Sequence, residues 1–166
     1  MKPIRLKQTY ELLQSYEVFK NKNVIISDPI PASKEDLLTF HSGEYINAVE
    51  KLNDGNVTKD AISFNLGPGD NPIYKNIYDA SLLSTGGSLV AAKMLESGKV
   101  DRAFNISGGL HHAMPGYAYG FCVFNDPVIA INHFLTKGLK VAYVDIDCHH
   151  GDGVQLAFYD TDAVLT

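Results

Sequence analysis

Apolar residues in the first half of the chain recur at steps of three and four residues, which is the period of an amphipathic helix. One such stripe, with Leu6, Tyr10 and Leu13 at its centre, predicts a helix over residues 4–19, with Pro3 in a position that a helix start tolerates. Ser33-Lys34-Glu35-Asp36 has the spacing of a capping box and predicts a second helix. Residues 43–52 predict a third.

The longest periodic stretch covers residues 77–95 and ends before Gly98, a residue type that often ends helices. Gly86 and Gly87 lie inside it, and each should cost about 1 kcal/mol relative to alanine. We therefore expect another segment to pack closely against the helix backbone there. Residues 66–72 hold two prolines and two glycines, so they predict a loop.

The second half of the chain changes period. Residues 103–106 and 140–146 predict strands, and Asn125-Asp126-Pro127 predicts the start of a helix that ends before Gly138. A further strand should begin near Ala163. Strand, helix and strand in this order form a βαβ unit with parallel strands and a right-handed crossover. The predicted fold class is α/β, in a single domain.

Composition narrows the class of protein. The 166 residues are 45% hydrophobic and 20% charged, which is typical of a folded globular domain. Fourteen basic and nineteen acidic residues give a net charge of −5, so we expect no direct nucleic-acid ligand. No apolar run reaches the roughly 18–20 residues that cross a membrane, and we expect no membrane contact. Cys122 and Cys148 do not form a disulfide framework, which favours a reducing cytoplasm.

Two polar clusters follow the two predicted strands. Ser107-Gly108-Gly109-Leu110-His111-His112 follows the first strand, and Asp145-Ile146-Asp147-Cys148-His149-His150-Gly151-Asp152 follows the second. Ligands of parallel sheets collect at the carboxyl ends of strands, and neighbouring strands lie about 4.8 Å apart. We therefore expect the two clusters to meet in one pocket.

The second cluster has a spacing suited to a metal. In an extended chain Asp145, Asp147 and His149 would point to one side, and Cys148 would point to the other. A carboxylate and an imidazole are common ligands of zinc, so Asp147 and His149 are the predicted ligand pair. For Cys148 we favour core packing over a role as a thiolate ligand.

The remaining polar residues suit proton transfer. An aspartate that accepts a hydrogen bond from one histidine nitrogen fixes the tautomer and raises the basicity of the other nitrogen. His111 and His112 can pair with Asp145 and Asp152 in this way. Such pairs beside a metal suggest hydrolysis. The separate residues His41 and His133 are expected to be helix-surface or packing residues.

These blocks, together with Gly120-Phe121-Cys122-Val123-Phe124-Asn125-Asp126, resemble the signature sequences of the histone deacetylase superfamily. Within that superfamily the start Met1-Lys2-Pro3-Ile4-Arg5 is most similar to the prokaryotic acetoin-utilization type. The resemblance implies an arginase-like three-layer α/β sandwich with a mainly parallel sheet, incomplete in this chain. It also implies hydrolysis of an acetyl-lysine or related acetyl-amide to acetate and an amine.

The resemblance further implies roles for single residues. Asp147 and His149 match two of three metal ligands, for zinc or alternatively iron, and the tandem histidines His111 and His112 act on the attacking water with Asp145 and Asp152 as their partners. Asp70 matches a rim residue that binds the substrate backbone, Gly120 and Phe121 match the wall of the acyl-lysine tunnel, and Arg5 matches an acetate exit channel. The residues that match structural potassium sites are Asp145, Asp147, His149, Phe158, Thr161 and Val164.

Members of the superfamily are about twice as long as this sequence. We therefore expect residues 1–166 to be a partial catalytic domain without the first strand and the C-terminal half. The expected missing parts include an aspartate ligand, a glycine-rich loop and the tyrosine that polarises the acetyl carbonyl. Loss of such a donor lowers rates by about 10²–10³ in other enzymes, so we expect little or no activity from this chain alone.

Two other functions compete with the deacetylase. A ureohydrolase of the same superfold would bind two manganese ions rather than one transition metal, and the tandem histidines and the Gly-Phe-Cys sequence speak against it. A binding or assembly module would use its unfinished sheet edge to associate with itself or with another chain. A compact monomer would speak against this module.

Overall fold

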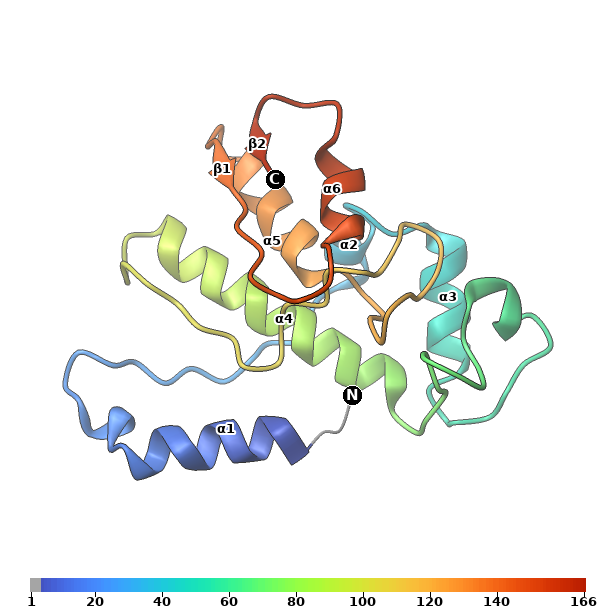
Figure 1. Ribbon diagram of the computed structural model, residues 1–166, viewed down its shortest axis with the longest axis horizontal. Coiled ribbons are helices and arrows are strands. Elements are labelled where there is room, and N and C mark those ends of the chain that lie inside the picture. The colour runs from blue at the N-terminus through green and yellow to red at the C-terminus, as the bar shows by residue number, and fades with distance from the viewer. Residues whose placement is uncertain (1–3) are drawn as a thin grey trace.

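The computed structural model describes residues 4–166, so Met1–Pro3, including the predicted helix-start position of Pro3, lie outside the described residues. The chain is mostly helical and ends in a small parallel sheet (Figure 1). In chain order the elements are α1 (Ile4–Ser15), the 3₁₀ helix η1 (Val18–Lys20), α2 (Lys34–Leu37), α3 (Gly43–Lys51), the 3₁₀ helix η2 (Ala61–Phe64), α4 (Ile77–Glu96), α5 (Asp126–Leu135), β1 (Val141–Ala142), α6 (Asp152–Phe158) and β2 (Val164–Leu165).

The first predicted helix is confirmed over Ile4–Ser15 and is wrong beyond it, because Glu17 has φ +55° and the chain continues as η1. The apolar stripe of α1 is not used for packing on the rest of the chain. None of the α1 residues is buried, and α1 stands apart from the other helices in Figure 1. Its main apolar contact is local, between the rings of Tyr10 and Phe19, whose centroids are 5.0 Å apart. Helix α1 therefore contributes little to the core.

The predicted capping box at the second helix is confirmed. The Ser33 hydroxyl accepts the Asp36 N–H at 3.1 Å, and the Asp36 carboxylate accepts the Ser33 N–H at 2.8 Å. Both groups would otherwise lack partners at the helix start. The predicted third helix is confirmed as α3, which turns Tyr45, Ile46 and Val49 into the core.

Helix α4 crosses the middle of the molecule and confirms the longest predicted helix (Figure 1). The chain between η1 and α2 lies directly on it, because the Ala32 N–H donates to the Leu82 carbonyl at 3.0 Å. A Cβ atom on Gly86 would lie 1.8 Å from the Ile30 carbonyl oxygen. This contact explains why a glycine occurs in the middle of a helix.

Helix α5 begins and ends as predicted. The Asn125 side chain accepts the Val128 N–H at 3.2 Å, and Gly138 follows the helix in a left-handed conformation with φ +71°. Helix α5 packs along α4 and joins two apolar clusters. The first is centred on the fully buried Tyr45, Ile77, Phe124 and Ile129, and the second contains Val128, Ile131, Val154, Phe158 and Val164.

The sheet is smaller than predicted. Strands β1 and β2 are parallel, with Val141 opposite Val164, and α6 connects them, so one parallel βαβ unit is present. The predicted strand over residues 140–146 is wrong beyond Ala142, and the predicted strand over residues 103–106 is wrong because those residues are not in a strand. The predicted βαβ unit around α5 is therefore also wrong, and the observed unit is built around α6 instead. Phe104 in that segment is 75% exposed. A strand needs a hydrogen-bonded neighbour, and within residues 4–166 only β1 and β2 pair.

Within the described part of the chain, no helix combines the length and the hydrophobicity that crossing a bilayer requires.

The close contact at Gly86 gives a test of this packing. We expect Gly86→Ala to lower the free energy of unfolding by about 3 kcal/mol, because the new methyl group would overlap a backbone oxygen that cannot move without breaking the contact with α4. Gly116→Ala is the matched control, since a Cβ atom there meets nothing within 4 Å. Urea unfolding measures both changes. Equal stabilities of the two variants would contradict the contact.

Candidate active site

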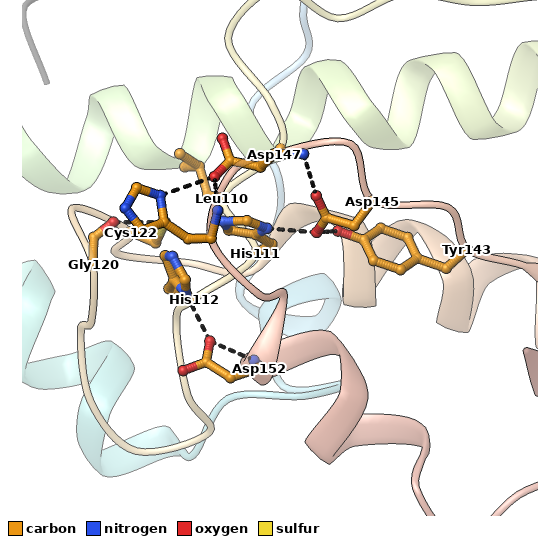
Figure 2. Close-up of polar contacts among 12 residues, drawn as sticks. Leu110, His111, His112, Gly120, Cys122, Tyr143, Asp145, Asp147 and Asp152 are labelled. Carbon is orange, nitrogen blue, oxygen red and sulfur yellow. Dashed lines mark hydrogen bonds and ion pairs between the residues drawn. The ribbon is translucent and has the colours of Figure 1, made fainter. Parts of the chain in front are cut away.

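Two histidine–aspartate pairs form the centre of the site (Figure 2). The Nδ1 atom of His111 lies 2.6 Å from Oδ2 of Asp145, and Nδ1 of His112 lies 2.6 Å from Oδ1 of Asp152. The two imidazole rings are adjacent, with centroids 4.1 Å apart. The predicted meeting of the two clusters is therefore observed, although the route is different, because residues 103–106 form no strand beside β1.

The short distances define the state of both rings. An ionised carboxylate can only accept hydrogen bonds, so the proton of each neutral ring must be on Nδ1. Each Nε2 atom then has a free lone pair. The two rings are mostly shielded from water, with His111 the more buried, whereas the carboxylates of Asp145 and Asp152 are partly exposed. This arrangement orients both imidazoles for proton transfer at Nε2.

Two glycines make room for the pairs. A Cβ atom on Gly120 would lie 2.4 Å from the His112 ring, and one on Gly151 would lie 2.5 Å from the Asp145 carboxylate. Both distances are too short for any side chain. Gly120 also has φ +52°, a conformation that glycine adopts without strain.

Asp145 is held by three donors. Burial alone would raise the pKa of its carboxyl group, but hydrogen bonds from Tyr143, His111 and the backbone N–H of Asp147 lower that pKa to about 2. The Tyr143 hydroxyl donates at 2.5 Å and the Asp147 N–H at 2.9 Å. Asp145 is therefore a carboxylate at neutral pH. Tyr143 was not among the predicted site residues, because it reads as an apolar strand position.

Hydrogen bonds from Asn125 and His41 hold the loop that carries His111 and His112. The Asn125 amide donates to the carbonyl oxygens of His111 at 3.1 Å and Ala113 at 3.0 Å. Its backbone N–H donates to Nε2 of His41 at 2.9 Å, and Nδ1 of His41 bonds the Met114 carbonyl at 3.0 Å. His41 is only 2% exposed, which confirms the expected packing role. The sequence indicated only the helix cap at Asn125.

A buried carboxylate holds the same loop from the other side. Asp126 accepts the N–H groups of Gly109 at 3.1 Å and Leu110 at 2.8 Å, and the Ser88 hydroxyl at 2.5 Å. Burial raises the pKa of Asp126, and these three donors oppose that change. The sequence indicated only an acidic first turn of the helix here.

The predicted metal ligands lie together on an exposed loop. Nδ1 of His149 is 3.0 Å from Oδ1 of Asp147, and Sγ of Cys148 is 3.3 Å from Nδ1 of His149. One donor atom from each of the three residues lies within 4.8 Å of the others. Carboxylate, imidazole and thiolate are all zinc ligands, so the residues fit such an ion.

The predicted alternation along this segment is wrong. Asp145 and Asp147 each accept the backbone N–H two residues ahead, at 2.9 and 2.8 Å, so the chain turns instead of extending. The N–H of His149 in particular lowers the pKa of Asp147. Because of these turns Cys148 is exposed beside His149, which also contradicts its expected core packing.

Other predicted residues lie outside the pairs. Asp70 is in the exposed loop before α4, and Phe121 is half exposed at the tip of a tight turn next to Gly120. Arg5 lies on α1, which has no buried residue and stands apart from the other helices in Figure 1. Phe158, Thr161 and Val164 follow one another from the end of α6 to β2. His133, the other histidine expected on a surface or in packing, is half buried on α5 with Nε2 3.9 Å from Glu96.

The sequence of this chain is similar to those of known proteins. Residues 1–166 match the histone deacetylase domain family. The chain is 39% identical over 169 residues to histone deacetylase RPD3 of Saccharomyces cerevisiae, covering 100% of this chain and 38% of that protein. It is 39% identical over 164 residues to acetoin utilization protein AcuC of Bacillus subtilis, covering 98% of this chain and 42% of that protein.

The fold of this chain is also similar to that of a solved structure. The crystal structure of an HDAC homolog from Aquifex aeolicus matches with a TM-score of 0.79 at 40% sequence identity, covering 87% of this chain and 39% of that one. The same fold is therefore present in part. The chain spans less than half the length of each of these relatives.

The buried state of His41 predicts a pH dependence of stability. Burial lowers the pKa of His41 from 6.5 to about 4, against the opposing effect of the Met114 carbonyl. The folded state thus binds fewer protons than the unfolded state, and the contribution of His41 to stability is complete above pH 6.5 and is lost as the pH falls toward 4. From this difference in pKa we expect the free energy of unfolding to fall by about 2 kcal/mol between pH 7 and pH 5.

His41→Gln keeps a polar side chain that does not titrate. Over the same pH interval, the free energy of unfolding of the variant should therefore fall by about 2 kcal/mol less than that of the parent. Urea unfolding at the two pH values measures this difference, and the titrations shared by both proteins cancel. The same pH dependence in both proteins would contradict the assignment.

Proposed function

Because the chain belongs to the histone deacetylase domain family, we propose that it provides the proton-transfer groups and two metal ligands of a metal-dependent deacetylase. The reaction is hydrolysis of an acetyl-lysine or related acetyl-amide to acetate and an amine. The observation that supports this proposal most strongly is the pairing of His111 with Asp145 and of His112 with Asp152, each at 2.6 Å.

The two rings serve the two proton transfers of amide hydrolysis. Attack of water on the acetyl carbonyl needs a base, and departure of the amine needs an acid. One imidazole accepts the water proton at Nε2, and the aspartate at its Nδ1 stabilises the imidazolium that forms. The other ring, when protonated, donates from Nε2 to the leaving nitrogen. Two adjacent pairs allow both steps at one carbonyl group.

Asp147 and His149 would hold the metal, with zinc as the first candidate and iron as the second. When bound, such an ion polarises a carbonyl group and lowers the pKa of water. The structural potassium sites belong to the same proposal, with Asp145, Asp147 and His149 at an inner site and Phe158, Thr161 and Val164 at an outer one.

The substrate would lie against the surface beside His112. Asp70 would accept hydrogen bonds from the backbone of the substrate, and Gly120 and Phe121 would form a wall beside the acyl-lysine side chain. The half-exposed ring of Phe121 supports this role, because it presents apolar area next to the pairs. Arg5 on α1 would line an acetate exit channel.

The finer classification also belongs to the proposal. The βαβ unit of β1, α6 and β2 supports an arginase-like three-layer sandwich of which this chain holds a part. An acetoin-utilization type is compatible with the relatives but is not singled out by them, since AcuC and RPD3 are both 39% identical to this chain. The two free cysteines are compatible with a reducing cytoplasm.

One observation favours the second candidate, a binding or assembly module. Apolar side chains next to the small sheet are exposed, and Ile146 is 96% exposed. Val144 and Leu165 are exposed as well. Such residues favour association of this edge with another chain or segment. A two-metal ureohydrolase has no comparable support, because residues 1–166 match the deacetylase family.

Deacetylation of an acetyl-lysine peptide, followed as acetate release with excess protein, tests the proposed function. We expect slow turnover that needs added zinc and is lost with a chelator. The rate of these 166 residues should be about 10²–10³ below that of a full-length relative, because Asp147 and His149 are two proposed ligands and catalytic zinc sites take about three. Turnover equal to that of such a relative would contradict the expected weakness.

The matched variants are His112→Ala and His150→Ala. His112→Ala removes a proton-transfer group and should lower the remaining rate by about 10² or more. His150 is exposed, bonds Gln155 at 3.0 Å and takes no part in the pairs, so its variant should retain the parent rate. Equal rates for the two variants, or turnover that does not depend on zinc, would contradict the proposal.

A further inference from the structure

Gly120 and Phe121 form the tip of a tight turn beside His112. Tyr119 and Cys122 exchange backbone hydrogen bonds of 3.1 and 2.8 Å, so the turn has two central residues. Both central residues have positive φ, +52° for Gly120 and +68° for Phe121. These values match a type I′ turn, which normally takes asparagine, aspartate or glycine. A phenylalanine in this conformation is strained and needs support from its surroundings.

Asn71 supplies that support. Its side-chain oxygen accepts the Phe121 N–H at 2.9 Å, a group that has no acceptor inside the turn. Its amide nitrogen lies 3.4 Å from the carbonyl oxygen of Ala118, which directly precedes the turn. Asn71 is buried, although it lies in a loop of mostly exposed residues. One side chain therefore holds both the start and the tip of the turn.

The backbone of Asn71 also fixes its own loop. Its carbonyl oxygen accepts the Gly67 N–H at 2.9 Å, which closes the loop over residues 67–71. Asp70 precedes Asn71 directly, and Pro72 follows it with a restricted φ. The path of the backbone at Asp70 relative to that at Phe121 thus depends on the hydrogen bond between Asn71 and Phe121.

We propose that Asn71 is a positioning residue that holds the loop of Asp70 and the turn of Phe121 in a fixed relative position and thereby sets the affinity for an acetyl-lysine side chain. This inference rests on the proposed function, in which Asp70 and Phe121 contact the substrate. Asn71 itself contacts neither the substrate nor the histidine pairs. Its loss should weaken substrate binding and leave the proton-transfer groups intact.

The chain contains a matched control for this residue. Asn65 also donates to the Ala118 carbonyl, at 2.8 Å, but it does not contact Phe121. Asn65 has φ +56°, so Asn65→Gly removes its hydrogen bond without adding backbone strain. Asn71→Ala removes the acceptor for the Phe121 N–H, whereas Asn71→Asp keeps an oxygen there.

Amide hydrogen exchange of Phe121, measured by NMR, is the first readout because it does not depend on activity. We expect Asn71→Ala to speed this exchange by about tenfold, the effect of one lost hydrogen bond. Exchange should remain slow in Asn71→Asp and in Asn65→Gly. Unchanged exchange in Asn71→Ala, or an equal increase in Asn65→Gly, would overturn the proposal.

Binding and turnover of the acetyl-lysine peptide form the second readout. Asn71→Ala should raise Kd and KM by about tenfold and change kcat by less than about threefold, and Asn71→Asp should restore most of the affinity. Faster exchange of Phe121 without a change in Kd or KM would overturn the link to the substrate. If the parent protein neither binds nor hydrolyses the peptide, the proposed function fails. Amide exchange of Phe121 in Asn71→Ala, unchanged or increased, then still decides whether Asn71 holds Phe121.

Discussion

The candidate site depends on one interaction, the hydrogen bond between an aspartate and the Nδ1 atom of a histidine, which occurs twice. Each bond is 2.6 Å long, in the range of charge-assisted hydrogen bonds. A carboxylate at Nδ1 determines the tautomer and the direction of Nε2 together. The aspartates reach the histidines from segments 34 and 40 residues away in sequence, so the fold must bring these segments together before any chemistry is possible.

Much of the remaining structure supports this requirement. Asp126 holds the N–H groups of the histidine loop, and Asn125 holds its carbonyl oxygens, on two consecutive residues at the start of α5. Helix α5 is itself packed on α4 and α6. Asp152 is the first residue of α6, so packing of the second apolar cluster also positions the carboxylate that pairs with His112. Core packing and the geometry of the candidate site are therefore linked through α5 and α6.

The sequence predicted the helices well, because their signals are local. Ser33, Asn125 and the glycines at positions 86 and 98 identify caps, ends and a close contact without knowledge of the rest of the chain. The strands were predicted less well, since residues 103–106 and 144–146 have an apolar pattern but pair with no strand within residues 4–166. After β1, the Tyr143 N–H still donates to the Leu165 carbonyl of β2 at 2.7 Å. The Asx turns at Asp145 and Asp147 compete with an extended chain, and the period of the sequence does not show which alternative is favoured. For the same reason the orientation of Cys148 was predicted wrongly.

The contacts of Asn71, Asp126 and His41 join segments that are distant in sequence. Each of these residue types is also common in turns, helix caps or packing, so the sequence alone does not indicate such contacts.

The account is tested most directly by the protonation of the two imidazoles, read from their ¹⁵N chemical shifts by NMR near neutral pH. In the neutral rings of His111 and His112 we expect the proton on Nδ1 and a free lone pair on Nε2. In Asp145→Asn the new side-chain amide can donate a hydrogen bond to Nδ1 of His111. The substitution should therefore move the proton of His111 to Nε2 and leave the proton of His112 in place. Protons on Nε2 of both neutral rings in the parent protein, or no response of His111 to Asp145→Asn, would contradict the account.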